Sequence, residues 1–285
     1  MVPATTLLVS TYNWPEALEL VLLSALAQQL APSQLVVADD GSREETGAMV
    51  RGLVPAFAAR GIALLHVWQE DAGFRKARIL NAALARATGD YVVQIDQDLI
   101  LHPAFLASHA AFARRGSFVQ GSRVLVRPER TREAIARRET RFHALDAGLK
   151  NRVNALHLPW LSALVPTSQE HLRGTRGVNF AFWRDDALRV NGWNEEFEGW
   201  GREDSEFAAR LLNAGLVRRK LKFAGVGYHL WHPECSRHAV PEQERALHEI
   251  VAGRVVRCAR GLDAHLEAHL EAHLDVRAPR VDPTP

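Results

Sequence analysis

The sequence predicts an α/β fold in which a mostly parallel sheet is flanked by helices. The first observation is that β-rich apolar runs alternate with runs of helical periodicity between residues 5 and 95. The second is that pairs of acidic residues follow the second and fourth β-rich runs. Such alternation favours right-handed βαβ units, whose ligands bind at the carboxyl ends of the strands. We therefore expect the site at one edge of this sheet.

The elements of this half follow from local patterns. Before the first helix, Asn13 suits an N-cap and Pro15 a first helical turn. Ser42, with Glu45 three residues later, resembles a capping box that opens a second helix, and Gly89 is expected to end a third. Strands are expected at residues 5–10, 34–40, 62–69 and 90–95, and helices at 17–29, from 42 onward, and at 77–87.

Composition limits the function classes. The chain has 285 residues, 47% of them hydrophobic, which suffices for one large domain or two small ones. A net charge of +2 gives no reason to expect a nucleic-acid ligand. No run of about 18 apolar residues and no signal peptide is apparent. The only cysteines are Cys235 and Cys258, so a reducing compartment, such as the cytoplasm, fits best.

The second half is less regular. Residues 123–141 carry seven arginines, which form either a solvated helix face or a surface for an anionic lipid or phosphate. Residues 174–232, rich in Gly, Trp and Asn, suggest loops around a site. In the tail, a leucine stripe predicts an amphipathic helix or a homodimer contact, and a histidine stripe is a weaker metal candidate. The stripes are Leu262, Leu266, Leu270 and Leu274, and His265, His269 and His273.

Asp96 and Asp98 interrupt a hydrophobic run at the end of the fourth expected strand. A carboxylate beside a core is costly unless it is hydrogen-bonded, paired or bound to a cation. Residues i and i+2 of a strand point to the same side, so both could address one ligand. Their oxygens suit Mg²⁺ or Mn²⁺ with a diphosphate completing the shell. A D-x-D triplet alone is a weak signal, but Asp39 and Asp40 after the second strand strengthen it.

Several ordered motifs resemble glycosyltransferase family 2, which implies the GT-A fold. They are "STYNWPEALELVLLSALAQQ", "VVADDGS", "DAGFRKARILNAAL" and "GDYVVQIDQDLILHP". Further on, "RGVNFAFWRDDALRVNGWNEEFEGWGREDSEFAARLLNAG" and "GYHLWHPE" resemble the acceptor-side region of chondroitin-synthase-type and β-1,4-galactosyltransferase-type enzymes. The resemblance covers residues 4–234. It implies a donor-binding half (1–116) and an acceptor-binding half (117–234) of one GT-A domain, followed by a helical extension (235–285).

The resemblance also assigns residues on the donor side. It implies that Thr11 and Tyr12 line the base pocket, and that Asp39 or Asp40 bonds the uracil. Asp96 would contact the ribose or the donor sugar, and Asp98 would be the main metal carboxylate. Either His229 or His232 would be a further ligand, because a neutral imidazole suits Mn²⁺. A loop over the nucleotide and diphosphate would consist of Gly73, Phe74, Arg75 and Lys76, with Arg78 assisting.

The acceptor side lies in "GWGREDSE", residues 199–206. An inverting transfer needs a base that takes the proton of the attacking hydroxyl, and Asp204 is our candidate. Glu203 would bind acceptor hydroxyls or orient the loop, Trp200 offers an apolar face to a sugar, and Gly199 allows a tight turn. The alternative is that these acids only complement the dipole of the following helix.

Together these features predict an inverting glycosyltransferase that depends on Mn²⁺ or Mg²⁺. It would move a sugar from a UDP-sugar to a hydroxyl of a glycan or lipid-linked acceptor, in bacterial surface polysaccharide assembly. We expect it in the cytoplasm, in contact with the inner face of the membrane or free of it. Two other classes stay open: a nucleotidyltransferase that makes a nucleotide-sugar, and a non-catalytic carbohydrate-binding protein.

Overall fold

The computed structural model describes residues 2–162, 164, 168–169, 172, 175–233 and 240–268. Its centre is an eight-stranded sheet in the order β3-β2-β1-β4-β10-β6-β11-β9, beside a four-stranded sheet in the order β5-β12-β7-β8. The strands of the large sheet are β1 (Thr5–Thr11), β2 (Gln34–Asp39), β3 (Ala63–Trp68), β4 (Tyr91–Asp96), β6 (Ser117–Gly121), β9 (Ser168–Gln169), β10 (Phe180–Trp183) and β11 (Val217–Leu221). Those of the small sheet are β5 (Leu99–Leu101), β7 (Val124–Val126), β8 (Leu149–Lys150) and β12 (Gly227–His229).

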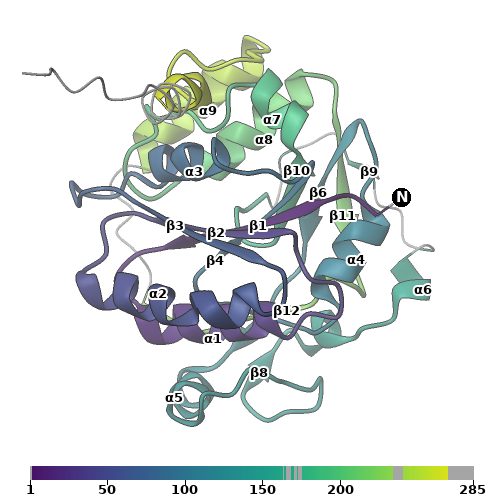
Figure 1. Ribbon diagram of the computed structural model, residues 1–285. Helices are drawn as coiled ribbons and strands as arrows, with labels where there is room; N and C mark the ends of the chain where they lie inside the picture. The colour runs from purple at the N-terminus through teal and green to yellow at the C-terminus, as the bar shows by residue number, and fades with distance from the viewer. Residues whose placement is uncertain are drawn as a thin grey trace, which may run out of the picture.

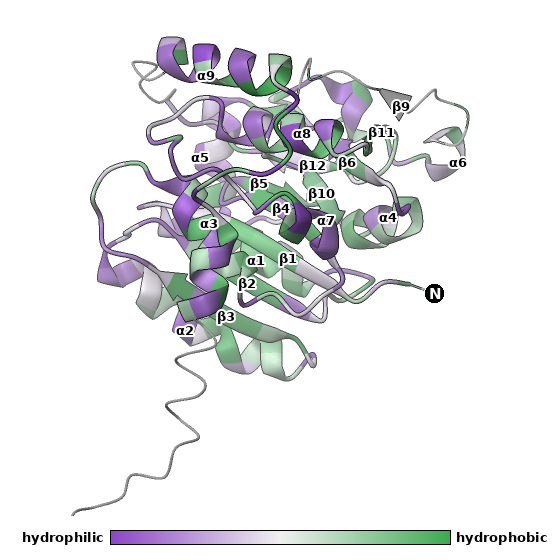
Figure 2. Ribbon diagram, turned by 90° about the horizontal axis from the view of Figure 1, so that it is seen from above, coloured by the Kyte–Doolittle hydropathy of each residue, from purple (hydrophilic) through white to green (hydrophobic). Residues whose placement is uncertain are grey.

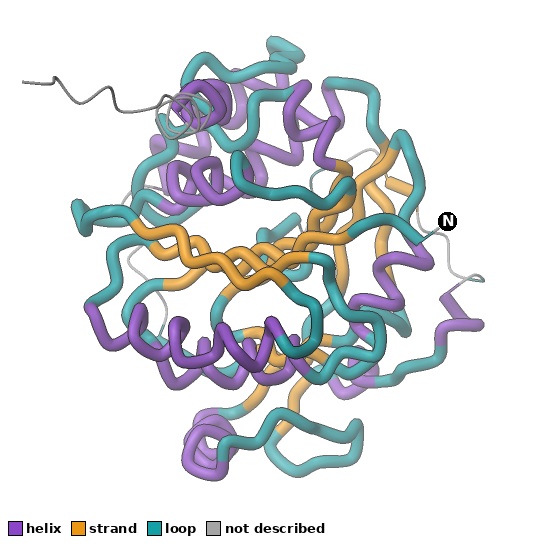
Figure 3. Tube along the Cα trace, viewed as in Figure 1, coloured by secondary structure: helices purple, strands orange, loops and turns teal. Residues whose placement is uncertain are grey.

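Helices cover both faces of the large sheet (Figures 1 and 3). The first six helical elements are α1 (Pro15–Leu26), α2 (Glu44–Ala58), α3 (Lys76–Leu84), α4 (Phe105–Phe112), α5 (Pro128–Arg137) and the 3₁₀ turn η1 (Arg152–Ala155). The others are α6 (Pro159–Ser162), α7 (Arg184–Arg189), α8 (Glu203–Asn213) and α9 (Val240–Ala252). One apolar cluster fills the space between the sheet and α1 and α2, and a second lies under α3, α7 and α8. The hydropathy colours of Figure 2 place the most apolar segments in the central strands.

The predicted α/β class is confirmed. Strands β3, β2, β1 and β4 pair in parallel, as the alternation of strand and helix requires. β10 then pairs antiparallel to both β4 and β6, so the sheet is mixed beyond its first four strands. In this register Ser10 lies beside Asp96, and Thr11 lies beside Asp39. The carboxyl ends of β1, β2 and β4 therefore meet at one edge.

Three local predictions were wrong. Gly89 does not end the third helix, because α3 ends at Leu84 and Ala85 is its C-cap. Asn13 is not a helix cap: it has a left-handed φ of 46°, and its side-chain oxygen accepts a hydrogen bond from the backbone N–H of Arg43. Ser42 forms no capping box, because α2 begins at Glu44 and the Ser42 hydroxyl oxygen instead accepts from the backbone N–H of Asn13 at 2.8 Å. Both polar side chains thus join the loops after β1 and β2.

The described part of the tail packs on the body of the molecule. α9 lies beside α8, and residues 262–268 form a further helical segment. Leu262 is 1% exposed and belongs to the second core cluster, with Leu266 partly buried against it. The amide of Asp263 donates to Asn191 Oδ1 at 2.9 Å. This half of the leucine stripe is therefore used within the chain; Leu270, Leu274, His269 and His273, like Cys235, lie outside the described residues.

We expect two truncations to differ sharply in stability. Deleting residues 269–285 should leave the free energy of unfolding close to that of the full chain. Deleting 262–285 should lower it by about 2–5 kcal/mol, because it removes the buried Leu262 and the hydrogen bonds that the amides of Leu262 and Asp263 donate to Asn191. Denaturant unfolding of both variants measures the difference, and equal midpoints would contradict it. UDP affinity is expected to be retained in both.

Within the described ranges, no helix is both long and apolar enough to cross a bilayer.

Candidate functional site

Three of the predicted acidic residues lie around one largely buried lysine. Lys76 is the first residue of α3, rather than part of the preceding loop, and its side chain is 13% exposed. Its Nζ lies 2.9 Å from Asp96 Oδ1 at the end of β4. The same nitrogen is 3.5 Å from Asp204 Oδ2 and 3.9 Å from Glu203 Oε1, both in the first turn of α8. One cation thus joins the predicted donor-side and acceptor-side carboxylates.

The pKa values of this cluster follow from burial and mutual charge. Burial alone would lower the pKa of Lys76, but Asp204, Asp96 and Glu203 outweigh it and raise that pKa well above its ordinary value. Burial raises the pKa of Glu203 to about 7, with the charge of Asp204 adding to the effect. Burial opposes ionisation of Asp96 too, yet Lys76 and a 2.7 Å hydrogen bond from the Ser10 hydroxyl lower its pKa. The cluster therefore holds carboxylates of different basicity.

Of the two acceptor-side carboxylates, Asp204 has the more accessible side chain, which is 16% exposed against 5% for Glu203. Its Oδ1 accepts a hydrogen bond from Gln94 Nε2 at 3.3 Å. A Cβ at residue 177 would lie 2.0 Å from Asp204 Oδ2, so glycine is required there for this side chain to keep its place. Glu203 Oε2 instead accepts from the amide of Gly201 at 3.2 Å, within its own loop.

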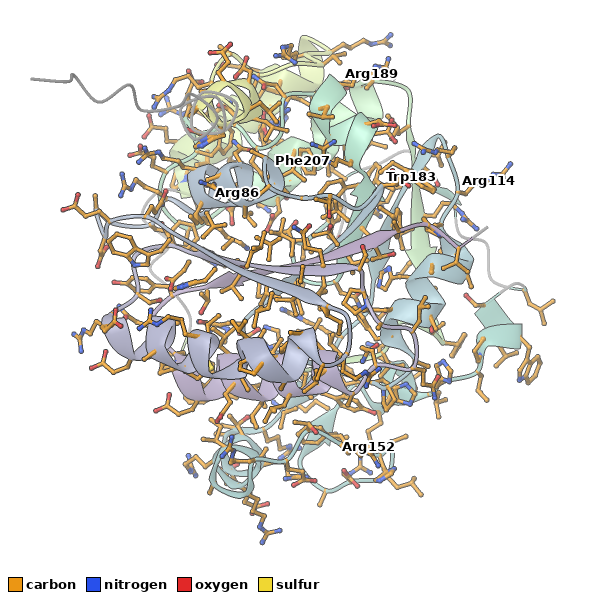
Figure 4. The ribbon with its side chains drawn as sticks, viewed as in Figure 1. Arg86, Arg114, Arg152, Trp183, Arg189 and Phe207 are labelled. Atoms are coloured by element: carbon orange, nitrogen blue, oxygen red, sulfur yellow. The ribbon has the colours of Figure 1, made fainter. Side chains whose placement is uncertain are left out.

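Helix α8 is fixed in place by a buried ion pair. Arg210 and Glu206 are both fully buried and lie one helical turn from each other. Arg210 Nη2 is 2.6 Å from Glu206 Oε2 and also donates to the carbonyl of Gly192 at 2.7 Å. Phe207 of α8, labelled in Figure 4, packs against Trp193 with ring centroids 4.6 Å apart and against Phe182 of β10 with ring centroids 5.2 Å apart. Removing one partner of such a pair would strand a buried charge. These contacts hold the helix that presents Glu203 and Asp204.

A second group of side chains could hold a metal ion. Asp98, His229 and His232 offer ligand atoms that all lie within 4.8 Å of one another. His232 Nε2 is 3.1 Å from Asp98 Oδ2, and His229 Nε2 is 3.5 Å from Asp98 Oδ1. That Oδ1 is buried and has no hydrogen-bond partner among the described residues. A buried carboxylate with one imidazole beside each of its oxygens is a donor set that a divalent transition metal could bind.

The surroundings of the two histidines shift their pKa values in opposite directions. The hydrogen bond to Asp98 raises the pKa of His232 to about 9, whereas burial lowers the pKa of His229. Sequence reasoning treated them as rivals for one ligand position, and the structure brings both beside Asp98. It also corrects the expected geometry of the acidic triplet. β4 ends at Asp96 and a turn follows, so Asp96 and Asp98 do not share one face of a strand.

The proposed base pocket contains residues that the sequence did not single out. Gln97, between the two aspartates, accepts from the Thr11 hydroxyl at 2.5 Å and from the Tyr12 amide at 3.0 Å. Its own amide donates to the Tyr12 carbonyl at 3.1 Å. The Tyr12 hydroxyl, on a half-exposed ring, reaches Asp71 Oδ2 at 3.0 Å. Gln97 thus fixes the backbone after β1, a role that no local pattern reveals.

Asp39 and Asp40 both have internal partners. Asp39 is fully buried, and its oxygens contact the Ser42 amide and His66 Nε2, each at 2.8 Å. Asp40 accepts from Gln69 at 2.5 Å and from the Arg75 amide at 2.8 Å, and burial raises its pKa. Asp40 therefore holds the loop of Gly73 and Phe74. Which of the two contacts a base stays a prediction.

That loop contacts the acceptor-side segment. The amide of Gly199, at a φ of 81°, donates to the Phe74 carbonyl at 3.0 Å. Trp200 in the same segment is 37% exposed. Arg78, by contrast, is exposed and lies outside the acid cluster around Lys76.

Helix α9 contacts this loop through Glu244, which pairs with Arg202 at 3.0 Å, and through Gln243. Gln243 of α9 donates to the carbonyl of Glu198 at 2.8 Å and accepts from the Arg202 amide at 2.6 Å. It is buried, and a Cβ at Gly201 would lie 2.0 Å from its Oε1. The sequence placed α9 outside the matched region, so nothing in the motifs could indicate this clamp.

The sequence is similar to those of known glycosyltransferases. The sequence profile of glycosyl transferase family 2 matches residues 6–168, and that of the N-terminal domain of galactosyltransferase matches residues 165–233. Validoxylamine A glucosyltransferase of Streptomyces hygroscopicus subsp. limoneus is 28% identical over 75% of this chain and 49% of its own. Chondroitin synthase of Escherichia coli is 23% identical over 80% of this chain and 35% of its own. The chain thus spans half or less of these two relatives.

Solved structures share the fold. GalNAc-T7, solved with UDP, GalNAc and Mn²⁺, superposes with a TM-score of 0.62 at 12% identity, over 87% of this chain and 48% of that one. At that identity the likeness speaks for the fold alone, and it confirms the predicted GT-A architecture. With the profile match extending over more than half of its residues, the chain belongs to glycosyltransferase family 2.

Proposed function

We propose that the protein is an inverting, metal-dependent glycosyltransferase that moves a sugar from a UDP-sugar to a hydroxyl of a glycan or lipid-linked acceptor. The observation that carries this proposal is the cluster in which Lys76 joins Asp96 to Glu203 and Asp204. A donor contact and a base must lie close together for a hydroxyl to attack the anomeric carbon. GalNAc-T7, which shares the fold, was solved with UDP and Mn²⁺.

Asp98, His229 and His232 would hold the metal. A mixed carboxylate and imidazole set suits Mn²⁺ better than Mg²⁺, which prefers oxygen ligands and retained water. When bound, a divalent cation offsets the negative charge that develops on the leaving diphosphate.

Asp204 is the proposed base. Its carboxylate would accept the proton of the acceptor hydroxyl as the oxygen attacks, and Gln94 and Lys76 hold it in place. Glu203, deeper and with a pKa of about 7, would orient the loop around Gly201 and the acceptor hydroxyls. Trp200 and Gly199 would flank the acceptor sugar.

On the donor side, Thr11 and Tyr12 would line the base pocket, with Asp39 or Asp40 at the uracil. Gly73, Phe74 and Arg75 would cover the nucleotide, and Arg78 would act only from the outer side of α3. Asp96 would contact the ribose or sugar. A role in bacterial surface polysaccharide assembly is in keeping with the similarity to a chondroitin synthase.

The release of UDP tests the proposal. With Mn²⁺ and a set of UDP-sugars, release should increase when a hydroxyl acceptor is added. A nucleotidyltransferase would instead consume a nucleoside triphosphate and release pyrophosphate. A non-catalytic carbohydrate-binding protein would bind without releasing UDP, and either result would contradict the proposal.

Lys76→Met should lower the transfer rate by roughly 100-fold, because three carboxylates would then face one another without a cation. The acidic limb of the pH–rate profile should move to higher pH, since Lys76 favours the ionised form of Glu203. Arg86→Met, exposed and two residues beyond the end of α3, is the control and should leave the profile unchanged. A folded Lys76→Met enzyme with a normal rate and an unshifted profile would remove Lys76 from the site.

A further inference from the structure

Residues 127–153 form a cationic lobe at one pole of the molecule. They contain eight arginines and lysines against four carboxylates, a net charge of +4, whereas the whole chain carries only +2. The lobe comprises α5, β8 and the turns between them, and lies below α1 in Figure 1. Arg152 projects from it in Figure 4. Although the net charge of the whole chain is near zero, its positive charge is therefore concentrated in this lobe.

The lobe is firmly attached. Phe142 is buried and stacks on Tyr228 of β12 with ring centroids 5.0 Å apart, and the Tyr228 hydroxyl donates to the Phe142 carbonyl at 3.0 Å. β8 pairs with β7, which pairs with β12. The exposed residues of the lobe are therefore held by elements that are packed and hydrogen-bonded to the rest of the protein.

Most of its outward charge is not neutralised within the described chain. Arg130 is paired with Glu139 at 2.6 Å, Arg132 with Glu129 at 3.5 Å, and Arg138 with Glu19. The exposed cations with no carboxylate partner among the described residues are Arg127, Arg137, Arg141, Lys150 and Arg152.

Two large apolar side chains protrude among these charges. Leu145 is 89% exposed and Val153 is 65% exposed. Leu145 lies in a turn that is closed by hydrogen bonds from the Asp146 amide to the His143 carbonyl at 3.0 Å and from the His143 amide to Asp146 Oδ2 at 2.9 Å. An ordered turn thus carries an apolar tip that nothing in the described chain covers.

We propose that this lobe docks on the surface of an anionic lipid bilayer. Cations attract acidic headgroups, and an apolar tip between them gains by entering the headgroup layer. A soluble polyanion such as a nucleic acid would satisfy the charges but would leave Leu145 in water. The bilayer is therefore the occupant that matches both features.

Docking would place the site close to the membrane. The Thr131 hydroxyl of α5 accepts a hydrogen bond at 2.9 Å from the amide of Trp231, the residue before His232. The lobe is thus joined to the segment that carries the metal-site histidines. An acceptor anchored in the same bilayer would be presented to the site without free diffusion.

Vesicle flotation at about 0.1 M salt tests the proposal without any catalysis, so its failure leaves the proposed transfer untouched. The full chain should float with vesicles of phosphatidylcholine and phosphatidylglycerol and not with phosphatidylcholine alone. The triple variant Arg137→Gln, Arg141→Gln, Lys150→Gln should bind roughly 100-fold more weakly, since each cation near such a surface contributes roughly fivefold. Leu145→Ser should weaken binding roughly tenfold.

The matched control is Arg86→Gln, Arg189→Gln, Arg245→Gln, which removes the same charge from exposed positions at the end of α3 and on α7 and α9. Figure 4 shows Arg86 and Arg189 on the opposite side of the sheet from the lobe. This control should float like the parent. Three results would overturn the proposal. They are an equal loss of vesicle binding in both triple variants, no flotation of the parent, and binding of the parent to heparin beads but not to vesicles.

Discussion

Replacing Asp204 with asparagine is expected to lower the transfer rate by roughly 10²–10⁴-fold while the fold and the donor affinity are retained. The amide is nearly isosteric and can still accept the hydrogen bond from Gln94, but it cannot take a proton from an acceptor hydroxyl. Its contact with Lys76 is weakened, so a small loss of stability is expected as well. The measurement is the rate at saturating donor together with the melting temperature.

The competing explanation is that Asp204 only complements the dipole of α8. The N-cap of this helix is Arg202, with no side-chain capping bond, so Asp204 is not a cap and only the dipole effect remains. That effect is worth about 0.3–1 kcal/mol of stability and no activity. Glu45→Gln, a first-turn carboxylate of α2 with no ion pair among the described residues, is the control for it. A stable Asp204→Asn enzyme with near-normal turnover would rule out Asp204 as the base, and Glu203→Gln would then be tested.

The donor half could be predicted from the sequence because its signals are local. Alternating apolar runs gave four strands within two residues of their bounds, and the right-handed crossover rule gave their parallel order. The acidic residues at the strand ends followed from that order. The helix starts were less accurate, since Asn13 and Ser42 bond to each other's loops instead of to helix ends.

The centre of the site could not be predicted in the same way. Lys76 meets Asp96 from 20 positions away and Asp204 from 128, and no spacing rule connects them. Gln243 reaches the acceptor loop from a helix that carries no motif. Leu262 has the same periodicity whether it faces a second copy or its own core, and only the packed structure decides between them. Side chains that act over long sequence distances thus became visible only after folding.

Replacing Asp98 with alanine is expected to abolish the metal-dependent part of UDP binding. Asp98 is the only carboxylate of the group, so the variant would present two imidazoles and no negative charge to a divalent cation. Loss of a ligand should weaken the affinity for UDP with Mn²⁺ by at least about 100-fold, down to the affinity without metal. Calorimetric titration of UDP with and without Mn²⁺ measures both quantities.

The variant also separates the carboxylate from the histidines. Asp98 raises the pKa of His232 to about 9 through their hydrogen bond, so its removal should leave His232 neutral near pH 7 and free to bind metal. If the imidazoles sufficed, Mn²⁺ would still enhance UDP binding in Asp98→Ala, and Asp98 would not be a ligand. Asp90→Ala, at the opposite end of β4 and exposed, is the control and should keep the full Mn²⁺ effect. Asp98→Asn retains one side-chain oxygen. Its affinity for UDP with Mn²⁺ should lie between those of Asp98→Ala and Asp90→Ala, because a neutral oxygen can coordinate the cation but does not offset its charge.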